Sequence, residues 1–260
     1  MRGIVVCVDY ADLLAITLPN NMQHLSECLV ITSPQDSATQ ELVASIPNAN
    51  VFVTDAFYRD GAMFNKGRAI EEGFDALGRE GWIAIWDADI LFPTHMSEHM
   101  QNLRQDYLYG APRRMVEDPL SWDVSREWNL YPLSNDNKRV IGYLQMFHAD
   151  SPYLKGRRPW YDQTFIHAGG GDGYFENLTP RDHQCLLPFD VLHLGPRDSN
   201  WFGRATPRLD GTVPERSEEL KALVQRFHHA KGWCGKAHSG EVFPEKIVSA
   251  DVQQTGHVCR

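Results

Sequence analysis

Four short apolar runs, rich in β-branched residues, recur at regular intervals in the first third of the chain. They are IVVCV at 4–8, CLVIT at 28–32, NVFVT at 50–54 and WIAIW at 82–86. Each is followed directly by Asp or Ser, and its length suits a strand buried on both faces. Helical patterns separate the runs, over 13–25, 37–46 and 65–77. This alternation predicts an α/β, Rossmann-like fold, with a mostly parallel central sheet flanked by helices, because parallel neighbours need a crossover connection.

The sequence changes character after Pro93. Residues 105–165 are rich in Tyr, Trp, Arg, Asp and Pro, and only 140–147 carries a strand pattern. A further strand is predicted at 187–193, and a last helix at 214–232. We therefore expect a single domain made of a strand-rich half, a loop-rich half over the strand ends, and a C-terminal helix and tail: 1–95, 96–212 and 213–260.

The composition is that of a folded, acidic protein. Hydrophobic residues make up 42% of the 260 residues and charged residues 23%, which allows a sizeable core. The formal net charge of −9 disfavours a general polyanion binder. No apolar run is long enough for a membrane span or a signal peptide, so we expect a soluble cytoplasmic protein. The cysteines lack a tight framework, which favours free thiols: Cys7, Cys28, Cys185, Cys234 and Cys259.

Two carboxylates directly follow the fourth apolar run. In an extended segment Asp87 and Asp89 point to the same side, and they repel each other unless a cation or hydrogen-bond donors lie between them. A divalent metal ion is a natural partner for such a pair. The alternative is that one acid caps the following turn and the other is solvated. Because ligands of parallel sheets bind at the carboxyl ends of the strands, we expect a site here.

The segment FNKGRAIEEGF at 64–74 is the second candidate feature. Asn65 can cap a helix, and Lys66 and Arg68 then place positive charge in its first turn. Cations are unfavourable at that end of a helix unless an anion is bound there. A diphosphate is a suitable anion, and the alternative is an ordinary surface helix.

The order of these features resembles the GT-A glycosyltransferases, which transfer sugars from nucleotide-diphosphate donors and carry an Asp-x-Asp motif. The features are a polar end to the first strand, SPQD after the second, FNKGRAIEEGF, and WDADILFP. The resemblance covers residues 3–95, with a weaker pattern to 205, and is closest to the family-two-like and galactosyltransferase-like branches. The sequence departs from these branches where it lacks doubled acids after the second strand and a Gln-x-x-Arg-Trp signature.

The resemblance implies a role for each matched residue. A set of side chains is expected to contact the nucleotide sugar, of which a UDP-sugar is favoured: Asp9, Tyr10, Asp36, Lys66, Arg68 and Asp87. Asp89 is expected to bind Mn²⁺ or Mg²⁺ directly, with His193 completing the site and Asp87 close to the metal. A single His at a strand end is otherwise an ordinary satisfied polar residue.

The segment HAGGGDGYFENL at 167–178 resembles the Gly-Gly-acid segment in which inverting members keep their catalytic base. Asp172 is therefore expected to take a proton from the acceptor hydroxyl, with Glu176 as its main rival. The alternative is a flexible Gly-rich turn.

Two further groups of residues are candidates for binding. Cationic side chains interleaved with aromatic ones could bind a nucleic acid or stack on a sugar. Four residues are therefore candidates for acceptor contacts: Arg157, Arg158, Trp160 and Trp201. The alternative for 153–163 is a solvated loop with one buried Trp. A structural Zn²⁺ site could form in the tail, although the spacing is not that of a standard finger: Cys234, His238, His257 and Cys259.

Together these features predict a metal-dependent, inverting glycosyltransferase. Its acceptor hydroxyl could belong to a glycan, a small molecule, a protein or a hydroxymethylated DNA base. A nucleotidyltransferase that forms a sugar nucleotide is the first alternative, but the expected Gly-rich loop is missing from DYADLLAITLP at 9–19. A non-catalytic module that binds a nucleotide sugar or nucleic acid is the second.

Overall fold

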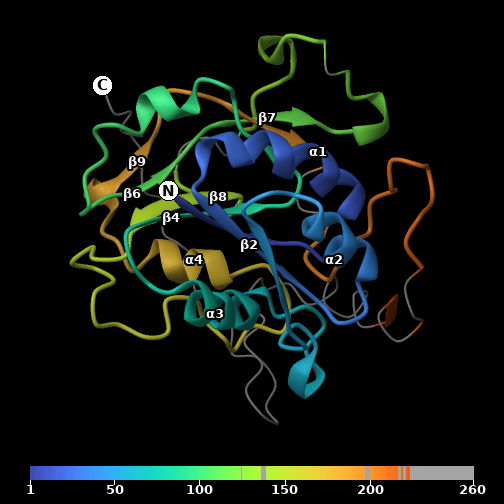
Figure 1. The fold of residues 1–260 in the computed structure, drawn as a ribbon, viewed down its shortest axis with the longest axis horizontal. Coiled ribbons are helices and arrows are strands. Elements are labelled where there is room, and N and C mark those ends of the chain that lie inside the picture. The colour runs from blue at the N-terminus through green and yellow to red at the C-terminus, as the bar shows by residue number, and fades with distance from the viewer. Residues whose placement is uncertain (124, 136–138, 197–199, 216–217, 219–220, 223–260) are drawn as a thin grey trace.

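The chain is built around a seven-stranded mixed sheet with the order β3-β2-β1-β4-β8-β6-β9 (Figure 1). The computed structural model describes residues 1–222 except 124, 136–138, 197–199, 216–217 and 219–220. The strands are β1 (Arg2–Val6), β2 (Glu27–Thr32), β3 (Ala49–Val53), β4 (Trp82–Asp87), β6 (Leu108–Gly110), β8 (Leu144–His148) and β9 (Gln184–Leu186). The first four are mutually parallel, and β8 runs antiparallel to β4 and β6. The predicted mostly parallel α/β sheet is confirmed.

Helices cover both faces of this sheet. They are α1 (Ala11–Asn21), α2 (Ser37–Ala44), α3 (Lys66–Leu77) and α4 (Gly171–Glu176). The apolar sides of α1 and α2 pack on one face, while those of α3 and α4 pack on the other (Figure 1). Asp36 and Asn65 cap α2 and α3, accepting backbone N–H groups at 3.1 and 2.9 Å. The crossover helices thus begin at the carboxyl ends of the parallel strands, where a ligand site is expected.

A second, three-stranded sheet lies over the end of β4. It has the order β5-β10-β7, formed by β5 (Ile90–Leu91), β7 (Arg113–Val116) and β10 (Val191–Leu194). His193 is in register with Ile90 on one side and Met115 on the other. The small sheet therefore brings three distant segments of the chain to the position where Asp87 and Asp89 emerge.

The structure differs from the sequence expectation in several elements. β3 forms the edge of the sheet and is half-exposed rather than buried. The strand predicted at 140–147 begins only at Leu144, and the one predicted at 187–193 begins only at Val191, in β10. The sequence did not predict β5, β6, β7, β9 or α4. The described residues also form short 3-10 turns: Met22–His24, Arg59–Gly61, Met96–His99, Pro119–Ser121, Trp128–Leu130 and Arg181–His183.

Further expectations concern membrane spans, the thiols and the C-terminal part of the chain. Within the described residues, no helix has the length and apolar character needed to cross a membrane. Free thiols are confirmed for Cys7 and Cys28, both buried, but the expectation is wrong for Cys185, which is disulfide-bonded. The helix predicted at 214–232 lies largely outside the described residues, and the candidate zinc ligands in the tail lie wholly outside them.

Candidate active site

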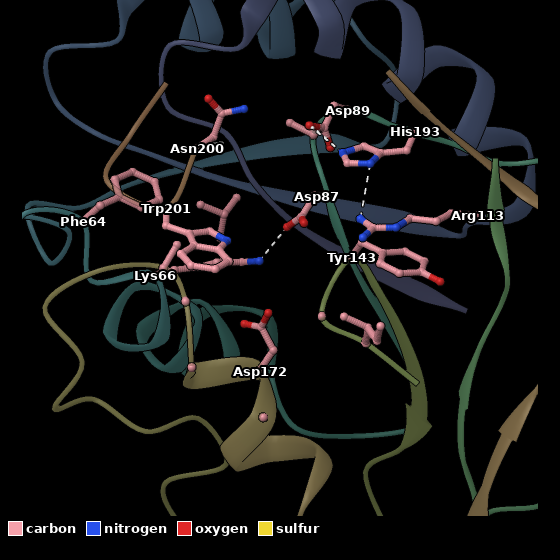
Figure 2. A pocket seen from close by; sticks show the side chains of 18 of the residues that line it. Phe64, Lys66, Asp87, Asp89, Arg113, Tyr143, Asp172, His193, Asn200 and Trp201 are labelled. Atoms are coloured by element: carbon pink, nitrogen blue, oxygen red, sulfur yellow. Dashed lines mark hydrogen bonds and ion pairs between the residues drawn. The ribbon is translucent and has the colours of Figure 1, made fainter. Parts of the chain in front are cut away.

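A cavity of about 680 Å³ opens at the carboxyl ends of β1 and β4. Its walls come from β1, β4, β7, β10, the start of α3 and α4, together with the segment around Trp201 (Figure 2). This volume lies within the range of about 300–1,000 Å³ that is common for small-molecule sites. Several predicted site residues line it together: Tyr10, Lys66, Asp87, Asp89, Asp172, His193 and Trp201.

Lys66 and Asp87 form an ion pair inside this cavity. The Lys66 Nζ donates to Asp87 Oδ1 at 2.5 Å, and the lysine is 7% exposed (Figure 2). Burial disfavours the ammonium, but Asp87 and Asp172 more than offset this and hold the pKa of Lys66 above its usual value. Arg68 does not line the cavity, and it pairs instead with Asp60 at 3.0 Å. Of the two cations predicted to meet the diphosphate, the structure brings only Lys66 to the site.

Asp89 and His193 lie against each other at the other end of the cavity. Asp89 is 8% exposed, and its Oδ2 lies 3.3 Å from His193 Nε2. Burial raises the pKa of Asp89, yet His193 and nearby donors overcome this and leave that pKa below its usual value. The Asp89 Oδ1 is buried without a hydrogen-bond partner in the described part of the chain. An orphaned carboxylate oxygen beside an imidazole fits a divalent metal ion such as Mn²⁺.

The described residues hold no group of three or more His, Cys, Asp and Glu side chains placed for one metal ion. Asp87, the third predicted ligand, is engaged by Lys66 rather than turned to Asp89 (Figure 2). A metal at Asp89 and His193 therefore needs further ligands from outside these side chains.

Arg113 is a site residue that sequence reasoning missed. It lies on β7, is 6% exposed, and its guanidinium is 4.4 Å from the centre of the Tyr143 ring. Its Nη1 lies 3.3 Å from His193 Nδ1 (Figure 2). The short strand that carries it has no strong periodic pattern, so only the pairing of β7 with β10 reveals that Arg113 faces His193.

Asp172 lies in the first turn of α4 and faces the cavity from the opposite side to His193 (Figure 2). Its carboxylate lies directly over Gly142, where an added Cβ would be 1.8 Å from Asp172 Oδ2. Burial raises the pKa of Asp172, helped by Asp87, although Lys66 acts in the opposite direction. The structure thus holds a separate carboxyl group with a raised pKa in the same cavity as the Asp89–His193 pair.

The glycine run before Asp172 shapes the floor of the cavity. Gly170 has φ of +117°, and an added Cβ would meet Phe165 Cε1 at 2.4 Å, so both the backbone and the space require glycine. A Cβ at Gly169 would lie 3.2 Å from the Trp201 ring. The Ala168 N–H donates to the Trp201 carbonyl at 2.8 Å, which ties the two cavity-lining segments together.

Of the three residues predicted to surround the nucleoside, only Tyr10 lines the cavity, and Asp9 and Asp36 lie outside its lining. Tyr10 lines the cavity, with the Arg204 guanidinium 4.6 Å from its ring centre. Asp36 does not line it: its carboxylate accepts the Asp9 N–H at 2.6 Å and caps α2. Asp9 pairs with Arg208 at 2.5 Å and also lies outside the lining. Asp9 and Asp36 therefore stabilise the turn that carries Tyr10, through the hydrogen bond between them and the Asp9–Arg208 ion pair.

Of the four candidate acceptor contacts, only Trp201 reaches the cavity. Trp160 is 3% exposed in the core, and its Nε1 donates to the Leu154 carbonyl at 3.0 Å. Arg158 is exposed and pairs with Asp75 at 3.0 Å, and neither it nor Arg157 lines the cavity.

Comparison with known proteins gives similarity in structure alone. No family model and no curated protein matches the sequence. An inositol-1-phosphate CTP transferase from T. maritima has a TM-score of 0.46 at 8% identity, covering 88% of this chain and 96% of that one. A 4-diphosphocytidyl-2C-methyl-D-erythritol synthase from Anaerococcus prevotii has a TM-score of 0.43 at 12% identity, covering 88% and 96%. A galactosyltransferase in complex with donor and acceptor sugar analogues has 0.40 at 11%, covering 85% and 99%. Similarity of this extent assigns neither an activity nor a ligand to this chain.

Proposed function

We propose that this protein is a metal-dependent, inverting glycosyltransferase that moves a sugar from a nucleotide diphosphate, with UDP favoured, to an acceptor hydroxyl. One observation carries the proposal. A single cavity combines the Asp89–His193 pair, a buried Lys66 and a separate carboxyl group, Asp172. Metal-assisted departure of a diphosphate and removal of a proton from an acceptor need groups of these kinds at one site.

Asp89 and His193 are the residues that would hold Mn²⁺ or Mg²⁺, because Asp89 Oδ1 is buried and unpaired within the described residues. When bound, the metal neutralises negative charge on the leaving diphosphate. The two side chains alone do not complete a coordination sphere, which leaves room for phosphate oxygens and water.

Lys66 adds a fixed positive charge beside the same diphosphate. Its ion pair with Asp87 holds the ammonium in the cavity, although the lysine side chain is otherwise long and flexible. Asp87, which is only partly buried, remains available to the ribose or to a metal-bound water on its second oxygen.

Asp172 acts as the general base in this proposal. The acceptor hydroxyl transfers its proton to the Asp172 carboxylate while its oxygen bonds to the anomeric carbon. The bond from that carbon to the diphosphate breaks, and its electron pair leaves with the nucleoside diphosphate. A pKa raised by burial brings the base closer to the working pH, which favours proton transfer.

The test separates this activity from sugar-nucleotide formation and from simple binding. The protein is mixed with a panel of nucleotide sugars, with and without Mn²⁺, and its melting temperature is measured. The phosphate-containing product is identified in the same samples. A ligand at 100 times its dissociation constant adds about 2.7 kcal/mol of stability, which a thermal shift detects. We expect a Mn²⁺-dependent shift and release of a nucleoside diphosphate. Pyrophosphate release from a nucleoside triphosphate and a sugar phosphate, or binding without any turnover, would overturn the proposal.

A further inference from the structure

Three residues of α4 line the cavity: Asp172, Gly173 and Glu176. Residues four apart on a helix have Cβ atoms about 5–6 Å from each other, so Asp172 and Glu176 are neighbours on the helix surface. Gly173 lies beside this pair, and an added Cβ there would meet no atom within 4 Å. The three residues therefore border an open space at this end of the cavity.

Glu176 is a buried polar group that the proposed reaction leaves unused. It is 4% exposed and lines the cavity, and its Oε1 has no hydrogen-bond partner among the residues that the structure describes. That oxygen forms an ion pair with the exposed Arg181, whose Nη1 is 3.4 Å away. Burial and Asp172 raise the pKa of Glu176, while Arg139 and Arg181 act in the opposite direction. A buried carboxyl group that accepts no hydrogen bond at this oxygen can accept one from a ligand in the adjoining open space.

We propose that Asp172, Gly173 and Glu176 form the acceptor subsite, and that its ligand is a neutral polyhydroxylated ring, that is, a carbohydrate acceptor. This inference rests on the proposed transferase function. The spacing of the two carboxyl groups suits two hydroxyl groups of one sugar ring. The hydroxyl at Asp172 gives up its proton and attacks the donor, while a second hydroxyl donates a hydrogen bond to Glu176.

Charge favours a neutral acceptor over a nucleic acid. Two buried carboxyl groups repel phosphate. The charge of Lys66 reaches Asp172, but its ammonium is paired with Asp87, and Arg113 lies beside His193. Among the described residues that line the cavity beside α4, Arg139 is the cation whose charge reaches Glu176. Nucleic-acid binding depends on several phosphate contacts, and the chain carries a net charge of −9.

The test uses two variants of the full chain and one control. Gly173→Leu fills the open space with a good helix former, so it should not lower the melting temperature. Glu176→Gln keeps the shape and removes the charge. Gly171→Ala is the matched control, because its Cβ would meet its nearest neighbour at an ordinary 3.8 Å and Gly171 does not line the cavity.

Two reactions are measured for each protein with Mn²⁺ and the donor found above: release of nucleoside diphosphate without acceptor, and sugar transfer to a panel of simple methyl glycosides. We expect Glu176→Gln to raise the KM for the glycoside by about tenfold to a hundredfold, the cost of one hydrogen bond to a charged group. Gly173→Leu should raise this KM by at least about tenfold, because its side chain occupies the space of the sugar ring. Donor hydrolysis should stay within about twofold of the parent, since neither change touches the donor side. The control should match the parent in both reactions.

The outcomes separate this inference from the proposed function. If the parent neither hydrolyses a donor nor transfers its sugar, both fail. If it hydrolyses the donor but uses an oligonucleotide with hydroxymethylcytosine and no glycoside, only the carbohydrate inference fails. Unchanged glycoside KM in a folded Gly173→Leu or Glu176→Gln protein would also overturn the subsite.

Discussion

Gly142 is the position at which a single methyl group tests the role of Asp172. In a Gly142→Ala variant the new Cβ would lie 1.8 Å from Asp172 Oδ2, 2.1 Å from its Cγ and 2.4 Å from its Cβ. Ordinary contact distances are about 3.5–4.0 Å, so the carboxylate must move by about 1.5–2 Å. The carboxylate can rotate into the cavity, but the Asp172 Cβ is fixed to the backbone, so the start of α4 or the segment at Gly142 must shift as well. We therefore expect a lower melting temperature, and turnover is measured well below it.

The expected loss of turnover follows from the displacement. A misplacement of about 1 Å can cost roughly a hundredfold in rate, and removal of a general base costs up to about ten-thousandfold. Gly142→Ala should therefore lower kcat for transfer by about 10²- to 10⁴-fold, or about 2.7–5.4 kcal/mol in the barrier. The dissociation constant of the donor with Mn²⁺, measured by calorimetry, should stay nearly unchanged because the Asp89–His193 pair is not disturbed.

Two controls show whether the effect passes through Asp172. Gly171→Ala adds the same methyl group to a neighbouring residue where only ordinary contacts result, and it should leave kcat unaltered. In an Asp172→Asn background, Gly142→Ala should add little to the loss, since both changes disable one group. Full activity of Gly142→Ala, or independent losses that multiply in the double variant, would refute this account of the site.

Four further outcomes are expected. The pKa of Asp172 in the folded protein lies above 3.8, so the contribution of this carboxyl group to stability falls as pH rises from the unfolded pKa through the folded one. In urea titrations, Asp172→Asn should therefore unfold at a higher urea concentration than the parent at pH 7, and the difference should vanish near pH 3. The acid limb of kcat/KM should likewise lie at higher pH than for an ordinary Asp, and a limb near pH 4 would contradict this. Lys66→Met should weaken donor binding by about tenfold or more, whereas Arg68→Met, which removes a cation paired outside the cavity, should not; equal effects in calorimetry would refute the difference. His193→Ala should weaken Mn²⁺ binding by at least about tenfold in titrations followed by electron paramagnetic resonance, and unchanged affinity would exclude it as a ligand.

The parallel core of the fold could be predicted because its signals are local. The strands β1, β2 and β4 are buried β-branched runs, and α3 carries its apolar stripe within one helix. The position of Asp87 at the end of β4 and of Lys66 at the start of α3 follows from that order alone. Parallel strands present their carboxyl ends at one edge, so both side chains were expected at one site there, and the structure adds that they form an ion pair.

Other parts of the site carry no local signal. Arg113 and Tyr143 lie on or beside short segments where propensity is weak, and Trp160 looks like a surface aromatic until its loop is seen packed into the core. Asp36 was expected to contact the nucleotide, yet a short polar residue before a helix serves equally well as its cap.

By itself the sequence determined the α/β architecture, the helix caps and the polar ends of the parallel strands, because each depends on residues close together in the chain. Only the tertiary structure decided that β10 pairs with β5, which places His193 against Asp89, and that Gly142 passes beneath Asp172. Those contacts join segments distant in sequence, and they exist because the small sheet and α4 bury their apolar faces against the main sheet. Burial of that kind depends on the whole core, which no single stretch of residues encodes.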